Sequence, residues 1–378
     1  MNLMKNNINP NKKSPFMNKE KCALFQLNIS IHMTIIIAMV SILAIGCTSR
    51  TVEKEVVESD KPSPVKVIFE TDMGNDIDDA LALDMLYKYA DQNKMEILAI
   101  TVNKNNKYAP LFIDLMNNWY GYSDIPIGAV TNGAYSGDDG TNYAQTTWEY
   151  LADGKRAFSG AASENTVFPE ATDLYRKVLS QQPNNSVTIV SVGFSTNLAR
   201  LLDSPSDDFT ELSGKDLINE KVKLLSIMAG NFDENRMQEF NVKIDINAAQ
   251  KVFKDWPTQI VASPFELGFQ IKYPASSIEK DFTWATPHPL VVAYENYLEM
   301  PYDRPTWDLT SMIYALEGGS EYFTSSNKGN ISVDDEGYTS FVEAPDGKHQ
   351  YLKVSPEQAT ALKNAFIDVI TSKPKNRE

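Results

Sequence analysis

Short apolar runs alternate with longer mixed segments along most of the chain, and this alternation predicts its elements. Six runs are rich in Val and Ile and apolar at successive positions, which is typical of strands buried on both faces of a parallel sheet. The predicted strands lie at residues 65–69, 95–102, 125–130, 187–193, 222–230 and 258–265. Predicted helices lie between and after them, at residues 78–92, 109–120, 172–182, 196–203, 246–256, 290–298, 307–317 and 355–372. The pattern indicates an α/β fold, a mostly parallel open sheet flanked by helices and built from right-handed βαβ units.

Two stretches depart from this alternation. Residues 329–354 alternate polar and apolar positions, with turn signals at Glu336-Gly337 and Asp346-Gly347. They predict a small antiparallel appendage near the C-terminus. Residues 131–171 are rich in Gly, Asn, Ser and aromatic residues. This composition fits equally a loop-rich cover over the sheet and a plain surface excursion.

The first 46 residues differ from the rest in charge and hydropathy. Five lysines and one glutamate precede an apolar run from Met33 to Gly46, and Cys47 follows. A basic region, an apolar segment and small residues before a cleavage point are typical of a bacterial export signal. The ending Ala44-Ile45-Gly46-Cys47 resembles a lipobox, in which Cys47 is lipidated. The alternative is an uncleaved membrane anchor, for which a run of 14 residues is short.

These features predict a lipoprotein signal peptide at residues 1–46, a tether at 47–64 and one folded domain at 65–378. We expect an exported lipoprotein, anchored to a membrane through Cys47. The outer membrane is favoured because Thr48, rather than an aspartate, follows the cysteine. The mature chain would keep one cysteine and two histidines, which excludes an intramolecular disulfide and argues strongly against a His/Cys zinc site.

Bulk composition limits the partners. The 378 residues are 42% hydrophobic and 22% charged, an ordinary globular composition. The formal net charge of −15 argues against nucleic acid as a partner, because binding to phosphates requires clustered basic residues.

The densest group of charges follows the first predicted strand, where Asp72, Asp76, Asp78 and Asp79 fall within eight positions. Sites in open α/β sheets lie at the carboxyl ends of strands, and Asp78 and Asp79 also begin a predicted helix. Two carboxylates ~4 Å apart repel by ~4 kcal/mol at an effective dielectric constant of about 20. A helix N-terminus returns only about 0.3–1 kcal/mol for each of them. Because only oxygen ligands are available, the cluster predicts a hard cation, Ca²⁺ in preference to Mg²⁺. The alternative is helix capping by Asp78, with the other acids in solvent.

Amides and carboxylates also follow later strands. They are Asn103, Asn105 and Asn106 after the second strand, Thr196 and Asn197 after the fourth, Asn231 after the fifth, and then Glu239 and Asn241. Side chains of this kind at one edge of a sheet suit a ligand with many hydroxyl groups.

Three motifs in this order resemble the inosine–uridine-preferring nucleoside hydrolase family. Residues 70–80, ETDMGNDIDDA, are similar to the family's Asp-x-Asp-x-Gly-x-Asp-Asp-Ala motif, with two extra residues before the paired aspartates. Residues 193–199 resemble its GP-LTN-A segment, and residues 239–241 its EFN segment. The resemblance runs from about Val65 to about Leu316, which is most of the predicted domain.

The resemblance implies hydrolysis of the N-ribosidic bond of a small-molecule riboside with a bound Ca²⁺. It implies that Asp72, Asp79, the backbone carbonyl of Thr196 and Asp308 hold the metal. Asp72 would also be the general base on a calcium-bound water. The implied ribose contacts are Asp78, Glu239, Asn241, Asn103 or Asn106 after the second strand, and Asn231 or Asn235. Family members commonly form homo-oligomers, which implies self-association here.

The chain departs from the family pattern at several positions. Trp307 stands where well-studied members have a histidine that helps to protonate the departing base. Tryptophan supplies no such proton, although it can stack on a base. His288 is a conceivable replacement, but with prolines on both sides it is better interpreted as structural. Asp76, in the lengthened part of the first motif, is predicted to have no catalytic role, and Glu70 in place of the first aspartate is predicted to lie behind the site.

Two other functions compete with hydrolysis of a riboside. One is a non-catalytic nucleoside- or sugar-binding lipoprotein that retains the metal site, which Trp307 favours and the proposed base Asp72 opposes. The other is a phosphatase of the haloacid dehalogenase type. It ranks last because Glu70 stands where that class needs an aspartate nucleophile.

Overall fold

The computed structural model describes residues 63–135, 142–319 and 321–377. The chain divides into two units, Met1–Lys61 and Pro62–Glu378. The first unit lies outside the described residues, and so do the predicted signal peptide, Cys47 and nearly all of the predicted tether. Within the described ranges, no helix has both the length and the apolar character needed to cross a membrane.

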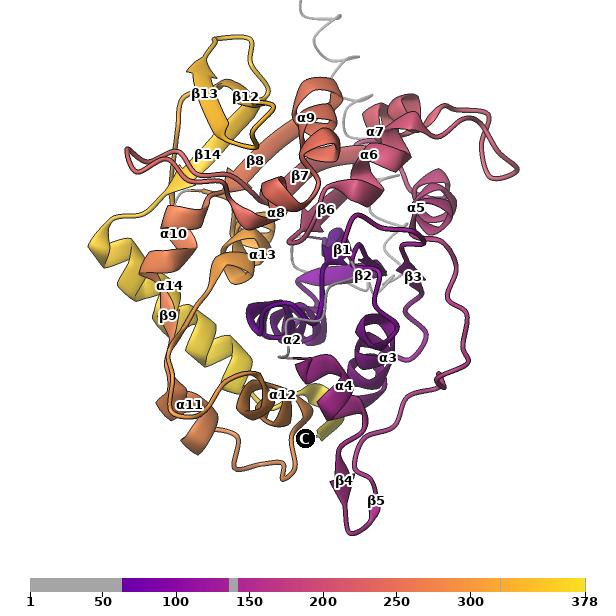
Figure 1. Ribbon diagram of the computed structural model, residues 1–378, viewed down its shortest axis with the longest axis vertical. Coiled ribbons are helices and arrows are strands. Elements are labelled where there is room, and N and C mark those ends of the chain that lie inside the picture. Colours follow the sequence, from indigo (N-terminus) through magenta and orange to yellow (C-terminus); the bar gives the residue numbers. More distant parts are fainter. Residues whose placement is uncertain (1–62, 136–141, 320, 378) are drawn as a thin grey trace, which may run out of the picture. The chain divides into compact units, whose positions relative to one another are not determined.

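A mostly parallel sheet forms the centre of the second unit, as the alternation of runs predicts (Figure 1). Its order is β13-β12-β14-β8-β7-β6-β1-β2-β3, and neighbours are parallel from β14 to β3. The six predicted strands are β1 (Val65–Thr71), β2 (Met95–Val102), β3 (Ile127–Ala129), β6 (Val187–Ser191), β7 (Val222–Met228) and β8 (Gln259–Ser263). β1 lies between β2 and β6 and is buried from Val67 to Thr71.

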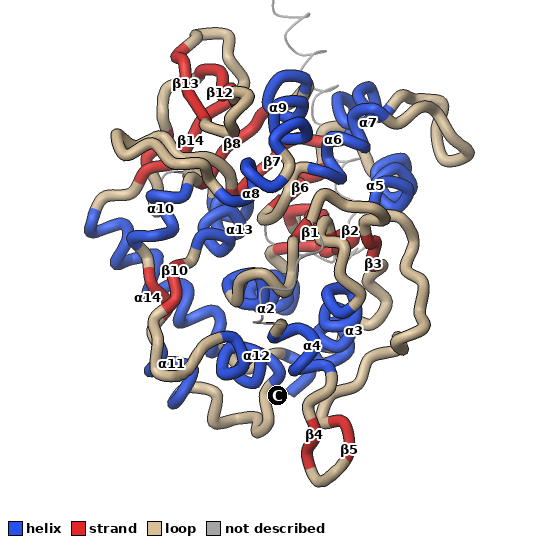
Figure 2. Tube along the Cα trace, in the orientation of Figure 1, coloured by secondary structure: helices blue, strands red, loops and turns tan. Residues whose placement is uncertain are grey.

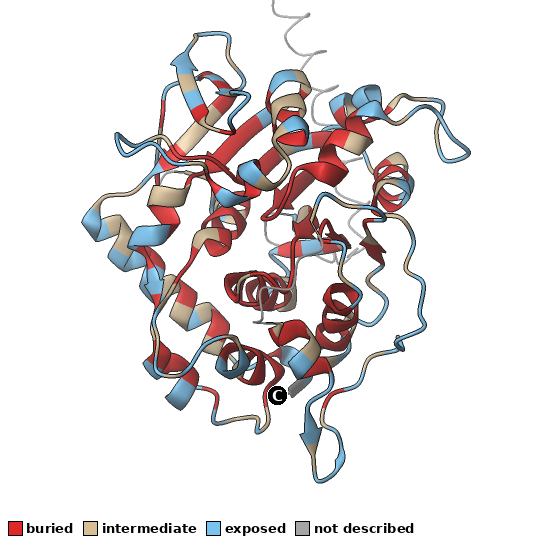
Figure 3. Ribbon diagram, viewed as in Figure 1, coloured by how far each residue is buried: buried red, intermediate tan, exposed pale blue. Residues whose placement is uncertain are grey.

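Helices cover both faces of the sheet and enclose two apolar cores (Figures 1 and 3). Alternate residues of β1 divide between the cores: Val67 and Phe69 belong to one and Ile68 to the other. The first core is built with α2 (Asp78–Asp91), α3 (Tyr108–Tyr120), α12 (Pro289–Tyr297), α13 (Trp307–Glu317) and α14 (Pro356–Thr371). The second is built with α5 (Ala171–Ser180), α6 (Thr196–Asp203), α7 (Gly214–Lys221) and α9 (Ile246–Asp255). Because successive side chains of a strand point to opposite faces, continuous apolar runs are required here.

The C-terminal strands are joined to the main sheet more closely than an appendage would be. β12 (Gly329–Val333) and β13 (Thr339–Glu343) form the expected antiparallel pair. β14 (His349–Lys353), however, pairs in parallel with β8 as well as antiparallel with β12 and with β11 (Thr324–Ser325). Without β14, the backbone groups of β8 would form an exposed edge, which is costly and prone to aggregation.

Residues 131–171 contain short elements that the composition does not reveal. α4 (Tyr143–Trp148) buries Tyr143 and Trp148 beside α3 and α12, and β4 (Leu151–Ala152) and β5 (Lys155–Arg156) form a small hairpin. This part of the chain is therefore partly a cover over the helices. Figure 2 shows the other described residues of this stretch mostly as loop. Other short elements that periodicity misses are α8 (Phe240–Ile244), α10 (Phe265–Gln270), α11 (Ala275–Lys280), β9 (Lys272–Tyr273), β10 (Arg304–Pro305) and η1 (Lys375–Arg377).

Candidate functional site

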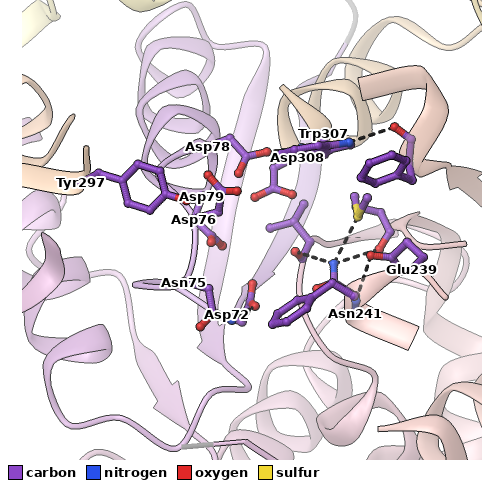
Figure 4. A pocket seen from close by; sticks show the side chains of 14 residues that line it. Asp72, Asn75, Asp76, Asp78, Asp79, Glu239, Asn241, Tyr297, Trp307 and Asp308 are labelled. Atoms are coloured by element: carbon purple, nitrogen blue, oxygen red, sulfur yellow. Dashed lines mark hydrogen bonds between the residues drawn. The ribbon is translucent and has the colours of Figure 1, made fainter. Parts of the chain in front are cut away.

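An acidic cavity of about 250 Å³ lies at the carboxyl end of β1 (Figure 4). Its lining comes from the ends of β1, β6 and β7, from the starts of α2, α8, α10 and α13, and from the end of α12. The lining residues are Asp72, Asn75, Asp76, Asp78, Asp79, Val192, Met228, Glu239, Phe240, Asn241, Phe265, Tyr297, Trp307 and Asp308. This is where open α/β sheets bind ligands, because the loops that leave neighbouring strands meet there.

The loop between β1 and α2 brings the first motif into the cavity. Gly74 has a φ of 101°, a left-handed conformation that strongly favours glycine. The hydroxyl of Tyr143 accepts a hydrogen bond from the Gly74 backbone N–H at 3.0 Å and donates one to the Asp76 carbonyl at 2.8 Å. The hydroxyl of Thr71 donates to Oδ1 of Asp79. These contacts turn the chain sharply, so that Asp72 and Asp79 line the same cavity.

Two of the helices that begin at this cavity, α2 and α13, contribute buried aspartates to it. Asp78 is the first residue of α2, and Asp308 lies in the first turn of α13. The backbone N–H of Asp308 donates a hydrogen bond to Oδ2 of Asp78 at 3.1 Å. Figure 4 shows Asp72, Asp78, Asp79 and Asp308 around one space, and all four are at most 4% exposed.

The electrostatics of the cavity favour protonated or cation-bound carboxylates. Burial raises the pKa of Asp72 to about 7, against the opposing effect of a hydrogen bond from Asn75. Burial also raises the pKa of Asp78, Asp79 and Asp308 well above the ordinary range, and the charges of neighbouring aspartates raise it further. A bound cation would remove this repulsion.

The donor chemistry of the cavity fits a hard cation. Its acidic side chains offer only oxygen, the ligand that Ca²⁺ and Mg²⁺ prefer. As they stand, the carboxylates are turned toward protein donors: Asp79 toward Thr71, Asp72 toward Asn75, and Asp78 toward the Asp308 N–H. Accordingly, no group of three or more His, Cys, Asp or Glu side chains in the described ranges is arranged to hold a metal ion.

Seven of the predicted site residues come together in this cavity, and four do not. Those that line it are Asp72, Asp78, Asp79, Glu239, Asn241, Trp307 and Asp308, and those outside its lining are Asn103, Asn106, Thr196 and Asn231. Five of the seven are acidic, which accounts for the strong electrostatic coupling in the cavity.

Thr196 lies apart from the acidic cavity. Its hydroxyl donates to Oδ2 of Asp245 at 2.6 Å, and both residues line a separate surface cavity. Val192 lines the acidic cavity instead, and its carbonyl oxygen accepts a hydrogen bond from the Asn241 amide at 3.2 Å. The physical reason is that β6 ends at Ser191, so Val192 is still at the strand end whereas Thr196 has already entered α6.

The three asparagines outside the lining have other partners. The amide of Asn103 donates to the Phe194 carbonyl at 2.8 Å and to Oε1 of the fully buried Glu70 at 3.2 Å. Asn106 accepts a hydrogen bond from the first backbone N–H of α3, at Tyr108. The amide of Asn231 donates to Oε2 of Glu266 at 3.0 Å. Glu70 itself is a fully buried residue of β1 and lies outside the lining of the cavity.

Glu239 and Asn241 tie the ends of two strands to α8. Glu239 caps the helix, with Oε1 accepting from the Asn241 N–H at 2.8 Å and Oε2 from the Val242 N–H at 3.1 Å. The Asn241 amide donates to the carbonyls of Val192 and Met228. Both side chains are therefore held by backbone groups, which is how a rigid polar wall is built.

Aromatic residues form the remaining wall, and residue types alone did not single most of them out. The indole N–H of Trp307 donates to the Phe265 carbonyl at 2.9 Å, and the two rings stack at 5.5 Å between centroids. A Cβ at Gly268 would lie 2.4 Å from Trp307 Cδ1, so this packing requires glycine. Phe240, Phe265 and Tyr297 also line the cavity. His288 is elsewhere, fully buried at the start of α12, where Nδ1 accepts from the Leu290 N–H.

Asp76, for which the sequence suggested no role, has a clear structural one. Its carboxylate lines the cavity and accepts hydrogen bonds from Nε of Arg304, at 2.7 Å, and from Nη2. The guanidinium carbon lies 5.1 Å from the ring centre of Tyr297 and 5.3 Å from that of Trp307. The lengthened motif is therefore joined to the segment that carries Trp307 and Asp308.

Breaking this ion pair is expected to destabilise the fold. Arg304→Met should lower the free energy of unfolding by about 1–3 kcal/mol, because Asp76 would lose both hydrogen bonds from the guanidinium group. Arg236→Met is the matched control, since its pair with Asp334 is 3.7 Å long and exposed, and should cost less than about 1 kcal/mol. Urea denaturation of both variants checks the difference. Equal losses would contradict the assigned role of Arg304.

Comparisons with known proteins place this geometry among solved structures. The family model described as inosine–uridine preferring nucleoside hydrolase matches residues 67–365. A plant nucleoside hydrolase is 18% identical, with a TM-score of 0.61 over 82% of this chain and 100% of that one. A purine-preferring ribonucleoside hydrolase from Gardnerella vaginalis is 15% identical, with a TM-score of 0.62 over 81% and 98%. An inosine–uridine preferring nucleoside hydrolase from Bacillus anthracis is 18% identical, with a TM-score of 0.57 over 81% and 99%. No curated protein matches the sequence. At these identities the structural likeness establishes the shared fold.

Proposed function

The chain belongs to the inosine–uridine-preferring nucleoside hydrolase family and is an N-ribosyl hydrolase, and we propose that its acidic cavity cleaves ribonucleosides with Asp72 as general base. The observation that carries the proposal is the meeting of four buried aspartates with Glu239 and Asn241 in one cavity. Carboxylates and a rigid amide suit a ribose, which offers hydroxyl donors on one face and develops positive charge as its base departs.

The residues divide the reaction between them. Asp78, Glu239 and Asn241 hold the ribose hydroxyls and fix the anomeric carbon where water can attack. Asp72 accepts the proton of that water as the new carbon–oxygen bond forms. The bond between the anomeric carbon and the base nitrogen breaks, and its electron pair leaves with the base. The surrounding carboxylates stabilise the positive charge on the ring as it develops.

A calcium ion fits the same cavity. Asp72, Asp79 and Asp308 would hold it, and the Val192 carbonyl is better placed to join them than that of Thr196. When bound, the ion would supply positive charge that lowers the pKa of an adjacent water molecule. The protein's part is to present three carboxylates on one side while Glu239 and Asn241 stay fixed by backbone hydrogen bonds.

The departing base would lie against the aromatic wall. Trp307 has no proton to give at this position, because its indole N–H is used by the Phe265 carbonyl. Burial raises the pKa of Tyr297, so its phenol stays protonated near neutral pH and is able to donate a hydrogen bond. We assign Tyr297 to contact the leaving group and Trp307 to shape the pocket around it.

A non-catalytic riboside-binding protein is the second candidate. The engaged indole of Trp307 favours it, since the usual leaving-group acid is replaced by a residue with a structural hydrogen bond. Asp72 argues against it, because a binding protein needs no buried base.

A panel of ribonucleosides separates the two functions. We expect Ca²⁺-loaded protein to release free ribose from at least one purine or pyrimidine nucleoside, as measured by a reducing-sugar assay. Isothermal titration with the same panel measures binding independently. Binding of nucleosides with no release of ribose from any of them would reject hydrolysis and support the second candidate.

Where the enzyme works is a separate proposal. We propose that it is exported and anchored to a membrane through a lipid on Cys47. The outer membrane is favoured because Thr48, rather than an aspartate, follows the cysteine. The lipobox-like ending before Cys47 supports the lipid anchor. Separately, the resemblance to the family supports self-association into a homo-oligomer. An external anchor would let the enzyme act on nucleosides before their uptake.

A further inference from the structure

Lys104 is a buried cation beside the acidic cavity. It lies two residues beyond the end of β2 and is 2% exposed. Its ammonium group donates a hydrogen bond to Oδ1 of Asn75 and lies 5.5 Å from the ring centre of Tyr135. Among the described residues it forms no ion pair with a carboxylate. A buried charge is costly, and the electrostatic attraction between Lys104 and the Asp72 carboxylate offsets part of that cost.

Asn75 connects this ammonium group to Asp72. Its side-chain amide donates through Nδ2 to Oδ2 of Asp72 and accepts from Lys104 through Oδ1. Asparagine is 8% exposed here and lies in the lengthened part of the first motif. The chain Lys104–Asn75–Asp72 is thus continuous and almost wholly buried.

The chemistry of the three groups allows one arrangement. An ammonium group has three donors and no acceptor, so only the carbonyl oxygen of Asn75 can face Lys104. The amino group of Asn75 must then face Asp72, whose ionised carboxylate only accepts. Lys104 and the Asp72 carboxylate therefore hold the amide in the same orientation from its two ends, and without Lys104 only the carboxylate holds it.

We propose that Lys104 is a positioning residue that acts through Asn75 to set the orientation of the Asp72 carboxylate. The hydrogen bond from Asn75 occupies Oδ2, and Oδ1 is left for the proton of the attacking water. This inference rests on the proposed function for its catalytic consequence, whereas the orientation itself follows from the contacts. Lys104 is not among the residues that line the cavity, so it acts on Asp72 through Asn75.

Kinetic analysis of four single variants and one double variant tests the proposal. Lys104→Met and Asn75→Ala should each lower kcat for ribose release about 10- to 100-fold, within the range that positioned proton transfer contributes, and change KM less than about threefold. Lys104→Arg and Asn75→Ser keep a donor and should retain most of kcat. In the Asn75→Ala background, Lys104→Met should cause no further loss, because Lys104 acts through Asn75. An unchanged kcat in Lys104→Met, or losses that multiply in the double variant, would overturn the proposal.

Calcium affinity provides a readout that does not depend on turnover. Removing a positive charge near the cavity should tighten Ca²⁺ binding if Lys104 acts only as a charge, and should weaken it if Lys104 orients a ligand. We expect Ca²⁺ titration of the ion-free protein to show several-fold weaker binding in both Lys104→Met and Asn75→Ala. Tighter binding in Lys104→Met would overturn the inference. If wild-type protein binds Ca²⁺ but releases ribose from no nucleoside, the proposed function is rejected. The Ca²⁺ titration of the variants would still decide whether Lys104 orients the Asp72 carboxylate. Where Lys104→Met fails to fold, the pair Asn75→Ala and Asn75→Ser decides the same question.

Discussion

Replacing Asp72 by asparagine is expected to lower kcat for ribose release by about 10³-fold, the middle of the range for loss of a general base. Asparagine keeps the size of the side chain, but its amide takes no proton from water. The change also removes one of the proposed calcium ligands, so the experiment is run at a Ca²⁺ concentration that saturates the variant. Because Asp78, Glu239 and Asn241 still hold the ribose, KM should change far less than kcat.

Asp153→Asn is the matched control for this substitution. Asp153 is exposed in the β4–β5 hairpin and has a φ of 52°, which asparagine adopts readily. This variant should keep wild-type kcat and thermal stability. If Asp72→Asn releases ribose at a rate within tenfold of this control, Asp72 is not the base.

Removal of the cation is expected to have the second large effect. Dialysis against a calcium chelator should reduce ribose release to under about 1% and lower the thermal stability, because Asp72, Asp79 and Asp308 would again repel one another. At a free Ca²⁺ concentration of about 100 times its Kd, binding to the folded state contributes ~2.7 kcal/mol of stability. Re-addition of Ca²⁺ should restore both activity and stability, and Mg²⁺ should do so less well.

The loss on chelation should depend on pH in a predictable direction. Burial raises the pKa of Asp72, a proposed calcium ligand, to about 7 in the ion-free fold. The folded state then binds more protons than the unfolded state between the ordinary carboxylate pKa and about 7. The stability that this pKa shift contributes is therefore fully present below pH ~4, and it is lost as the pH rises through about 7. Since Ca²⁺ replaces those protons, the gap in Tm with and without the ion should widen as the pH rises.

Differential scanning calorimetry at pH 5 and pH 8, with Ca²⁺ and with chelator, measures this gap. A Tm that is the same with and without Ca²⁺ at pH 8 would reject the cation site. A gap that is larger at pH 5 than at pH 8 would show that the buried carboxylates are not the groups that respond.

The pattern of apolar runs predicts the core architecture correctly. All six predicted strands and eight predicted helices are present, because burial on both faces of a parallel sheet requires continuous apolar runs. The short elements between Glu239 and Lys280 were missed, because five or six residues carry too little periodicity to be recognised. The partnership of β14 with β8 was missed because an alternating pattern specifies a half-buried strand and not its neighbour.

The motifs identified the acidic residues of the cavity more completely than the groups that hold those residues in place. The order of three motifs predicted the family, which the match over residues 67–365 confirms. Four predicted aspartates meet at one cavity: Asp72, Asp78, Asp79 and Asp308. They could be identified from the sequence because motifs at the ends of strands and the starts of helices are recognisable in the chain. For the backbone carbonyl, motif matching pointed to Thr196, whereas Val192 is the residue of this segment that lines the cavity. Any residue type can supply a backbone carbonyl, so the sequence does not mark which one lies at the cavity. The position at which β6 ends shows it.

What the sequence by itself determined is the layered α/β fold, the family and the carboxylates that converge on the cavity, because these depend on local patterns of apolar and charged residues. Only the tertiary structure decided what the rest of the lengthened motif does. Asp76 meets Arg304 across 228 positions of sequence, and Asn75 meets Lys104 across 29. Such contacts arise from the packing of loops at the sheet edge, where no periodicity links the partners. The physical reason is that burial makes a charge costly wherever it lies, but only the folded chain shows which partner compensates it.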